Sequence, residues 1–294
     1  MLNKFKYINV LLKNPIRVFS FFFLKFVSKK FARKKFFFHS SINKKVFLLS
    51  FDCDTQKDIN ALEQLLKKLK EINFKIVLAI PGELIKKNIE LIKSLRDKYN
   101  IEFLNHGYYL HTYFDDVNQN YEPIFSYENK NIEFIQEDIR LAHELFKKYF
   151  KIDLVGFRAP HFGDINFNKK KKIFKYLKKL GYTFSSSSIY DIALYKGAVF
   201  KIEGITEISV TGCADKPVKV LDSWSYLINK KNELILSTDY YLEIKKLHQI
   251  ILNKDYNFIN IYADPSHVAF DELFFKELKN FSKFNLLNFR DIRN

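Results

Sequence analysis

Residues 46–55 read VFLLSFDCDT, an apolar run that ends on two closely spaced carboxylates. The run from Val46 to Phe51 is almost continuously apolar, which is typical of a strand buried on both faces of a parallel sheet. Asp52 and Asp54 follow it, and alternation along an extended chain points both side chains to the same side. Two carboxylates this close repel each other unless a cation or a base separates them. The alternative is a polar strand end followed by a helix cap, for which Thr55 or Asp58 could serve.

Beyond this strand, apolar runs alternate with segments that carry apolar residues at helical spacing. We expect helices at residues 58–70, 83–99, 131–150, 169–180, 240–252 and 271–281. We expect strands or short extended segments at residues 74–80, 101–104, 154–157, 182–186, 199–202, 207–210 and 258–262. Residues 112–127 lack periodicity and are expected to form an inserted loop. This alternation predicts an α/β fold, a parallel sheet with helices outside it.

The number of units decides between the two parallel architectures. About seven strand–helix units over about 245 residues favour a closed or nearly closed (β/α) barrel, with an open doubly wound sheet as the alternative. No Gly-rich phosphate loop follows a predicted strand, which counts against a nucleotide site. In such barrels the chemistry sits at the carboxyl ends of the strands.

The net charge of +16 is concentrated near the N-terminus. Residues 1–51 contain twelve Lys or Arg and no Asp or Glu, which leaves 37 bases against 33 acids in the rest of the chain. We therefore expect a basic, aromatic N-terminal extension at residues 1–44 and a barrel domain at residues 45–294. The two cysteines are too few for a disulfide framework or a thiolate zinc site.

The extension has a composition that suits a membrane surface. Residues 17–38 read RVFSFFFLKFVSKKFARKKFFF, in which the longest apolar run is too short to span a bilayer and no signal-peptide cleavage site is found. We expect a cytoplasmic protein whose extension lies on the anionic inner face of the membrane. The alternative is an arm that packs on the barrel. Nucleic acid is disfavoured as a partner because no recognised binding module accompanies the charge.

Histidines follow the third predicted strand, in the sequence NHGYYLH. His106 and His111, together with Asp54 at a neighbouring strand end, would make the N/N/O ligand set that zinc favours. Taken alone, two histidines in a Tyr-rich loop indicate polar packing. If both histidines lie with Asp54 at the mouth of one barrel, a metal site is favoured over polar packing.

Two further strand ends carry charged or titratable side chains. Arg158 follows the strand in GFRAPHFG, where Pro160 prevents the strand from continuing, and a buried arginine needs a carboxylate partner such as Asp52. His267 follows the last strand in YADPSHV, and its ordinary pKa near neutrality suits a general acid or base.

Six segments, in this order, resemble the motifs of the polysaccharide deacetylase family, carbohydrate esterase family 4, whose domain is called NodB-like. They are SFDCDT (50–55), EFLNHGYYLH (102–111), GFRAPHFG (156–163), LGYTFSSSSIYD (180–191), ITEISV (205–210) and YADPSHV (262–268). The resemblance covers about residues 45–290 and implies a distorted (β/α) barrel of about seven parallel strands.

The resemblance also implies an activity and a role for each matched residue. The activity is metal-dependent hydrolysis of an N-acyl, foremost N-acetyl, group on an amino sugar or cell-envelope glycan. The implied metal ligands for Zn²⁺ are Asp54, His106 and His111. The implied catalytic residues are Asp52 as the base, Arg158 as the residue that orients it, and His267 as the acid, oriented by Asp191 or Asp264. Substrate contacts are expected from Tyr108, Tyr109, Pro160, His161 and Phe162, and an oxyanion contact from a backbone N–H near Tyr108 or Tyr109.

Two features leave alternatives open. The family usually has three residues between its two histidines and this chain has four, so either a bulge restores the geometry or His111 is not a ligand. The basic extension makes a deformylase or deacetylase of a lipid-linked sugar an alternative, and a catalytically degenerate glycan-binding barrel is another. Trp224, the only tryptophan, could stack on a sugar or pack in the core.

Overall fold

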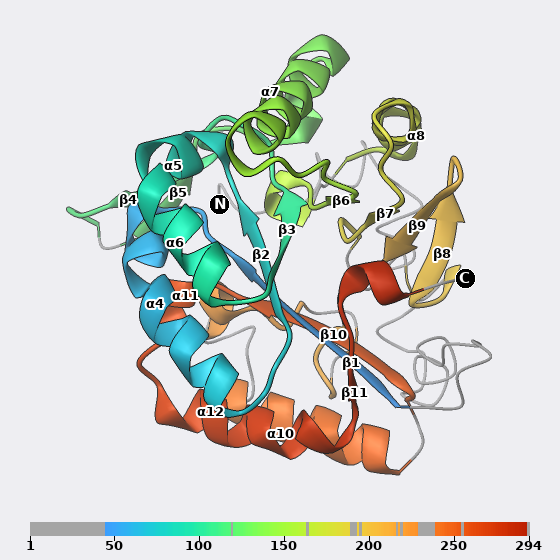
Figure 1. Ribbon diagram of the computed structural model, residues 1–294. Coiled ribbons are helices and arrows are strands. Elements are labelled where there is room, and N and C mark those ends of the chain that lie inside the picture. The colour runs from blue at the N-terminus through green and yellow to red at the C-terminus, as the bar shows by residue number, and fades with distance from the viewer. Residues whose placement is uncertain are drawn as a thin grey trace, which may run out of the picture.

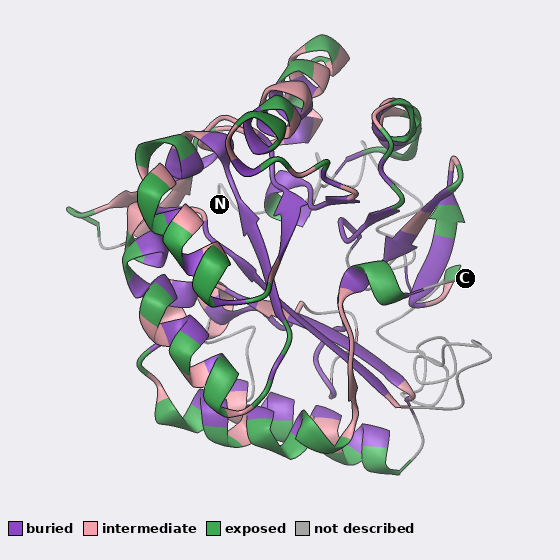
Figure 2. Ribbon diagram, in the orientation of Figure 1, coloured by how far each residue is buried: buried purple, intermediate pink, exposed green. Residues whose placement is uncertain are grey.

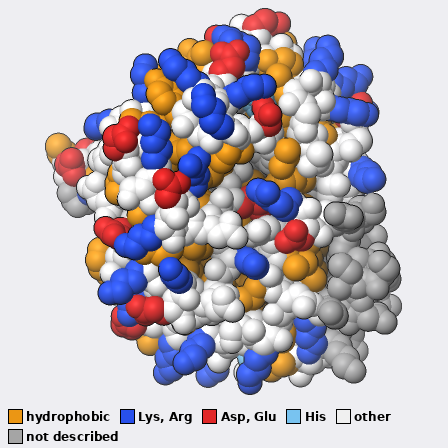
Figure 3. Space-filling model, in the orientation of Figure 1, with side chains coloured by type: hydrophobic (Ala, Val, Ile, Leu, Met, Phe, Trp, Pro, Cys, Tyr) orange, Lys and Arg blue, Asp and Glu red, His pale blue; other side chains and the backbone are white. Residues whose placement is uncertain are grey.

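A computed structural model describes residues 45–118, 120–162, 165–188, 193, 196–215, 217, 220–228, 239–253 and 256–292. The predicted extension at residues 1–44 lies outside this range, as does Asp191. Among the described residues, none of the helices combines the length and the apolar character needed to cross a membrane. On the face shown in Figure 3, Lys and Arg side chains are interspersed with Asp and Glu side chains.

The centre of the protein is a mostly parallel sheet with the strand order β10-β1-β2-β3-β6-β7-β9-β8 (Figure 1). Its strands are β1 (Val46–Asp52), β2 (Ile76–Ile80), β3 (Ile101–Asn105), β6 (Gly156–Phe157), β7 (Phe184–Ser185), β8 (Val199–Ile202), β9 (Ile205–Ile208), β10 (Phe258–Ala263) and β11 (Asn285–Leu286). Only β8 runs antiparallel to its described neighbour, β9, while the short β11 pairs in parallel with β1. The predicted apolar strand is present as β1, which is buried at every position.

The sheet curls toward a barrel because β10, at one end of the strand order, also contacts the segment that follows β9 near the other end. β10 pairs with β1, so that Leu48 lies opposite Asn260. On its other side, Asn260 accepts a hydrogen bond from the backbone N–H of Thr211, at 2.7 Å, in the segment that follows β9. The backbone N–H of Asn260 donates in return to Oγ1 of Thr211, at 2.9 Å. The predicted distorted barrel is therefore confirmed, and the open doubly wound alternative is wrong.

Helices cover the outside of the sheet (Figures 1 and 2). They are α4 (Gln56–Glu71), α5 (Gly82–Lys87), α6 (Ile89–Lys98), α7 (Ile132–Phe150), α8 (Phe167–Lys179), α10 (Tyr240–Leu252), α11 (Pro265–Val268) and α12 (Glu272–Lys279). Shorter turns of 3₁₀ or π helix occur at Tyr127–Asn129, Pro160–Phe162, Trp224–Ile228, Asn280–Lys283 and Phe289–Asp291. Figure 2 shows that each long helix buries one face and exposes the other, as the 3.6-residue pattern predicts.

Two segments differ from the prediction. The helix expected at residues 83–99 is divided into α5 and α6 at Asn88, which leaves the helical conformation (φ −118°, ψ 32°) and whose side chain also donates to the backbone oxygen of Leu84. The loop expected at residues 112–127 contains an antiparallel hairpin of β4 (Thr112–Asp115) and β5 (Asn120–Pro123). Its strands are partly exposed and too short to show a clear alternation of polar and apolar residues.

Candidate metal centre and active site

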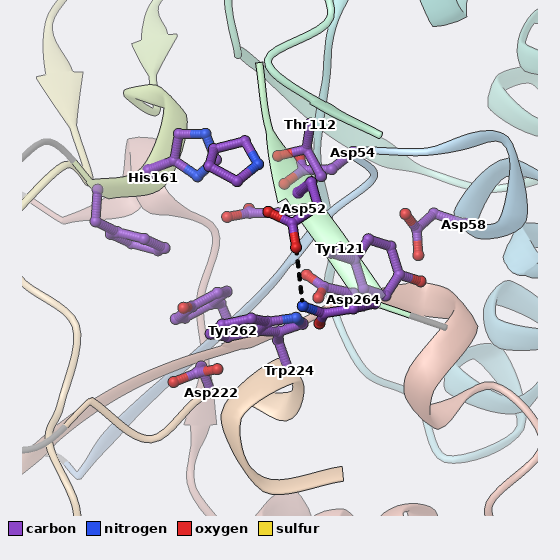
Figure 4. Close-up of a pocket in the computed structure, with 14 residues that line it drawn as sticks. Asp52, Asp54, Asp58, Thr112, Tyr121, His161, Asp222, Trp224, Tyr262 and Asp264 are labelled. Carbon is purple, nitrogen blue, oxygen red and sulfur yellow. Dashed lines mark hydrogen bonds between the residues drawn. The ribbon is translucent and has the colours of Figure 1, made fainter. Parts of the chain in front are cut away.

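A cavity of about 340 Å³ receives side chains from several strand ends and from the β4–β5 hairpin (Figure 4). Figure 4 shows Asp52, Asp54 and His161 on one side of it, and Trp224 and Tyr262 on another. Its described lining is Asp52, Asp54, Asp58, Thr112, Asn120, Tyr121, Glu122, Pro123, His161, Phe162, Asp222, Trp224, Tyr262 and Asp264. Six of these residues are acidic and none is Lys or Arg. The volume lies in the range of small-ligand sites.

Asp54 meets both predicted histidines at this cavity. Its Oδ1 lies 3.1 Å from Nε2 of His106 and 3.1 Å from Nε2 of His111, and the candidate ligand atoms all lie within 4.8 Å of one another. Burial acts to raise the pKa of Asp54, but His111 and His106 outweigh it and hold this pKa well below its usual value. Four residues separate the histidines, and the first of them, Gly107, has a positive φ of 76°.

The surroundings of the histidines suit metal ligands. Nδ1 of His106 lies 2.8 Å from the backbone oxygen of Arg158, which can only accept, so Nδ1 carries the proton and Nε2 offers its lone pair. His111 is fully buried: its Nδ1 has no hydrogen-bond partner, and its Nε2 has only the ion-pair contact with Asp54. An orphaned buried imidazole beside a carboxylate fits a divalent metal ion in an N/N/O donor set.

Asp52 and Arg158 form the expected ion pair. Nη1 of Arg158 donates to both carboxylate oxygens, at 3.1 and 3.2 Å, and Nη2 donates to Oγ of Ser50 at 2.7 Å. Burial raises the pKa of Asp52, and Arg158 opposes that rise. The guanidinium lies 4.5 Å from the ring centroid of Phe162, which lines the cavity. Asp52 therefore faces the cavity with a fixed orientation.

The helix-cap interpretation holds for Thr55 and Asp58. Oδ2 of Asp58 accepts from the backbone N–H and the hydroxyl of Thr55, at 2.9 and 2.8 Å, and closes a capping box at the start of α4. Oδ1 of Asp58 accepts from the backbone N–H and the hydroxyl of Ser266. Asp58 thus ties the start of α4 to α11, and it lines the cavity together with Asp52 and Asp54.

His267 lies on α11, next to the cavity but outside its lining. Its Nδ1 is 3.0 Å from Oδ2 of Asp264 and 2.9 Å from Oγ of Ser223, while its buried Nε2 has no hydrogen-bond partner. The ring packs edge-on against Tyr121, which lines the cavity. Burial lowers the pKa of His267, and burial together with repulsion from Asp58 and other acids raises that of Asp264.

The other predicted substrate contacts divide into two groups. His161 and Phe162 line the cavity, and both have a positive φ. Pro160 is buried outside the lining, and Tyr108 and Tyr109 also lie outside it. The backbone N–H groups of both tyrosines, near which the oxyanion contact is expected, donate to Asp138 at 2.7 Å.

Sequence reasoning missed several residues of the cavity. Asp222 precedes the π turn at Trp224, and both side chains line the cavity with Tyr262. Burial raises the pKa of Asp222. The pattern Asp-x-Trp around the single tryptophan was a usable signal for Asp222. Tyr121 and Glu122 come from the hairpin, for which the sequence offered no comparable signal.

Comparisons with known proteins agree with this architecture. A sequence model described as polysaccharide deacetylase matches residues 39–185. No curated protein sequence matches the chain. A protein from Mycobacterium smegmatis assigned as a polysaccharide deacetylase is 14% identical, with a TM-score of 0.62 over 85% of this chain and 88% of that chain.

Two other solved structures are more distant in shape. A CE4 family pseudoenzyme from Bacillus anthracis is 15% identical, with a TM-score of 0.46 over 81% of this chain and 62% of that chain. The peptidoglycan deacetylase PdaC from Bacillus subtilis is 14% identical, with a TM-score of 0.42 over 81% of this chain and 85% of that chain. At such identities the solved structures indicate the fold alone, while the sequence model covers half of the chain. The chain therefore belongs to the polysaccharide deacetylase family, whose members are hydrolases that act on N-acetyl amide bonds.

Proposed function

We propose that this protein is a metal-dependent hydrolase that removes an N-acyl group, foremost N-acetyl, from an amino sugar or glycan. The observation that carries the proposal is the position of Asp54 Oδ1, 3.1 Å from Nε2 of both His106 and His111. Asp52 with its Arg158 partner lies two residues away at the same cavity.

Asp54, His106 and His111 would hold the metal, which we propose is Zn²⁺ because two imidazoles and one carboxylate suit that ion. A bound divalent ion supplies Lewis-acid polarisation of the acyl carbonyl and a lowered pKa for a coordinated water. The chain supplies the ligand geometry, since the backbone oxygen of Arg158 fixes the tautomer of His106.

Asp52 is our candidate for the general base. Both of its oxygens accept from Arg158, so the carboxylate keeps one orientation at the edge of the cavity, where it can take a proton from the attacking water. The amine that leaves an amide needs a proton, and His267 is our candidate for its donor. Asp264 and Ser223 hold the Nδ1 side of that ring, which leaves Nε2 as the atom that would carry the proton.

The aromatic lining supports a sugar as the substrate. Tyr121, Phe162, Trp224 and Tyr262 surround the cavity, and flat rings of this kind stack on the apolar faces of sugars. A lipid-linked amino sugar is a finer proposal, supported by the basic, aromatic composition of residues 1–44, which would bring the protein to an anionic membrane.

The decisive experiment measures acetate released by the purified, zinc-loaded protein from a panel of N-acetylated sugars and glycans. Asp54→Ala and Asp52→Asn should abolish release or reduce it by at least 100-fold, a loss of about 2.7 kcal/mol of transition-state stabilisation. Asp97→Ala is the matched control, because Asp97 is an exposed carboxylate on α6. An absence of release across the panel, or an Asp54→Ala protein as active as the wild type, would contradict the proposal.

A further inference from the structure

The turn between the two histidines is fastened at each of its backbone N–H groups. Gly107 donates to Oδ1 of Asn105 at 2.9 Å, and Leu110 donates to Oε2 of Glu83 at 2.7 Å. Tyr108 and Tyr109 both donate to Oδ1 of Asp138, at 2.7 Å each. A short turn whose consecutive N–H groups all bind side-chain oxygens has little freedom to change its conformation.

Asp138 reaches this turn from the middle of α7. Its side chain is fully buried, and Oδ2 accepts a hydrogen bond of 2.6 Å from the hydroxyl of Tyr127. Burial raises the pKa of Asp138, and no Lys or Arg of the described residues forms an ion pair with it. Burying a carboxylate without a cation costs free energy. The hydrogen bonds that Asp138 accepts from the turn offset part of this cost.

Gly107 shows how closely α7 and the turn are fitted. Its φ of 76° is a conformation that residues other than glycine rarely adopt. A Cβ placed there would lie 2.2 Å from Oδ2 of Asp138 and 3.0 Å from the hydroxyl oxygen of Tyr127. Glycine is therefore required both for the turn and for the approach of the carboxylate.

We infer that Asp138 is a positioning residue for the metal centre, which it serves by fixing the four-residue turn so that His106 and His111 both face Asp54. The inference rests on the proposed metal site. An extra residue between two ligands would ordinarily displace the second one. Here the Gly107 turn and the two N–H groups held by Asp138 absorb it, and Nε2 of both rings lies 3.1 Å from the same carboxylate oxygen.

The test measures zinc affinity by chelator competition, and the absorption spectrum of the Co²⁺-substituted protein, for the full chain and three variants. Asp138→Ala should weaken zinc binding about 10- to 100-fold, the usual effect of losing a group that orients a metal ligand, and should change the Co²⁺ spectrum. Asp138→Asn should recover much of the affinity, because its Oδ1 can still accept from both N–H groups. Tyr127→Phe should weaken binding by less than Asp138→Ala.

The matched control is Glu102→Gln. Glu102 is another buried carboxylate at the opposite end of β3, where it accepts from the backbone N–H of Phe289 and pairs with Arg290. This variant should lower the melting temperature without changing zinc affinity or the Co²⁺ spectrum. If Asp138→Ala does not fold, Asp138→Asn and Tyr127→Phe test the inference instead. Both must then bind zinc more weakly than Glu102→Gln does.

Two results would overturn the inference. Zinc affinity and a Co²⁺ spectrum equal to those of the wild type in folded Asp138→Ala would show that the turn holds its ligands without the carboxylate. Wild-type protein that binds no zinc or Co²⁺ would instead contradict the proposed metal site itself. Because affinity is measured directly, the outcome does not depend on finding the sugar substrate.

Discussion

Arg158 donates from Nη1 to both carboxylate oxygens of Asp52, at 3.1 and 3.2 Å, where the two side chains are 0% and 6% exposed. Its Nη2 donates to the hydroxyls of Ser50 and Ser186, so the guanidinium joins the ends of three strands. Both hydroxyls are neutral partners of the guanidinium, and Asp52 lies at the wall of the cavity. Arg158 therefore both offsets the cost of burying Asp52 and sets its direction.

Replacing Arg158 by Met should destabilise the protein strongly. The change leaves the buried Asp52 carboxylate without its partner, and breaking a buried ion pair in this way costs about 3–5 kcal/mol. Urea denaturation of the wild type and of Arg158→Met measures the difference in unfolding free energy. Arg140→Met is the control, because Arg140 pairs with Glu137 and Glu144 on the exposed face of α7. An Arg158→Met protein as stable as this control would show that Asp52 is not held as an ionised partner.

Replacing His111 by Ala should remove the stabilisation that zinc confers. A ligand that binds only the folded state at 100 times its Kd stabilises it by about 2.7 kcal/mol, and loss of one of three ligands should remove most of this gain. Thermal unfolding with and without zinc gives the measurement. His143→Ala is the matched control, because His143 lies on α7 and bonds to Tyr182 instead of Asp54. Equal zinc-induced shifts in the two variants would contradict a ligand role for His111.

The stability of the protein should fall on mild acidification, in part because of His267. Burial lowers the pKa of this side chain, so the folded state favours the neutral ring more than the unfolded chain does. Its contribution to stability is complete above the unfolded pKa of about 6.5 and is lost as the pH falls below that value. The unfolding free energy of His267→Gln should therefore decline less steeply than that of the wild type between about pH 7 and pH 5.

Urea midpoints at each pH provide this comparison. The two proteins differ only at residue 267, so the difference between the two slopes reports on His267. Parallel curves for the wild type and His267→Gln would show that His267 does not titrate with a lowered pKa.

Trp224→Ala should impair substrate binding more than turnover. Trp224 lines the cavity opposite Asp52 and Asp54, at a distance from the proposed reacting groups (Figure 4). Loss of a stacking contact of about 1.4 kcal/mol would raise KM about tenfold with little change in kcat. Phe167→Ala is the control, since Phe167 is an exposed aromatic residue on α8. A fall in kcat with KM unchanged would place Trp224 in the chemical step instead.

Deleting residues 1–40 should abolish binding to anionic vesicles and spare acetate release from a soluble sugar. This segment holds most of the twelve bases that precede the first acid, and each base near an anionic surface contributes about 1 kcal/mol. Co-sedimentation with vesicles of anionic and of neutral lipid measures the effect, and binding by the full chain should weaken at high salt. Vesicle binding that survives the deletion would refute a membrane role for the extension.

Local patterns in the chain predicted much of the architecture. The apolar run of β1, the helical spacing of α4 and α7, and the strand–helix alternation are properties of short windows, and the structure contains each of them. The break at Asn88 and the β4–β5 hairpin were not predicted: Asn88 is held by a contact with Gln56 on another helix, and the hairpin strands are too short to show a clear polar–apolar alternation.

The sequence by itself determined which residue types stand at the strand ends, including Asp52, Asp54 and Arg158. Only the tertiary structure decided which of these side chains meet, and it added Asp138 and Tyr121, which no local pattern connected to the site. The physical reason is distance along the chain. Asp138 contacts a turn 30 residues before it, and Asp54 meets a histidine 52 residues after it, so these contacts form only when parallel strands bring their carboxyl ends to one edge.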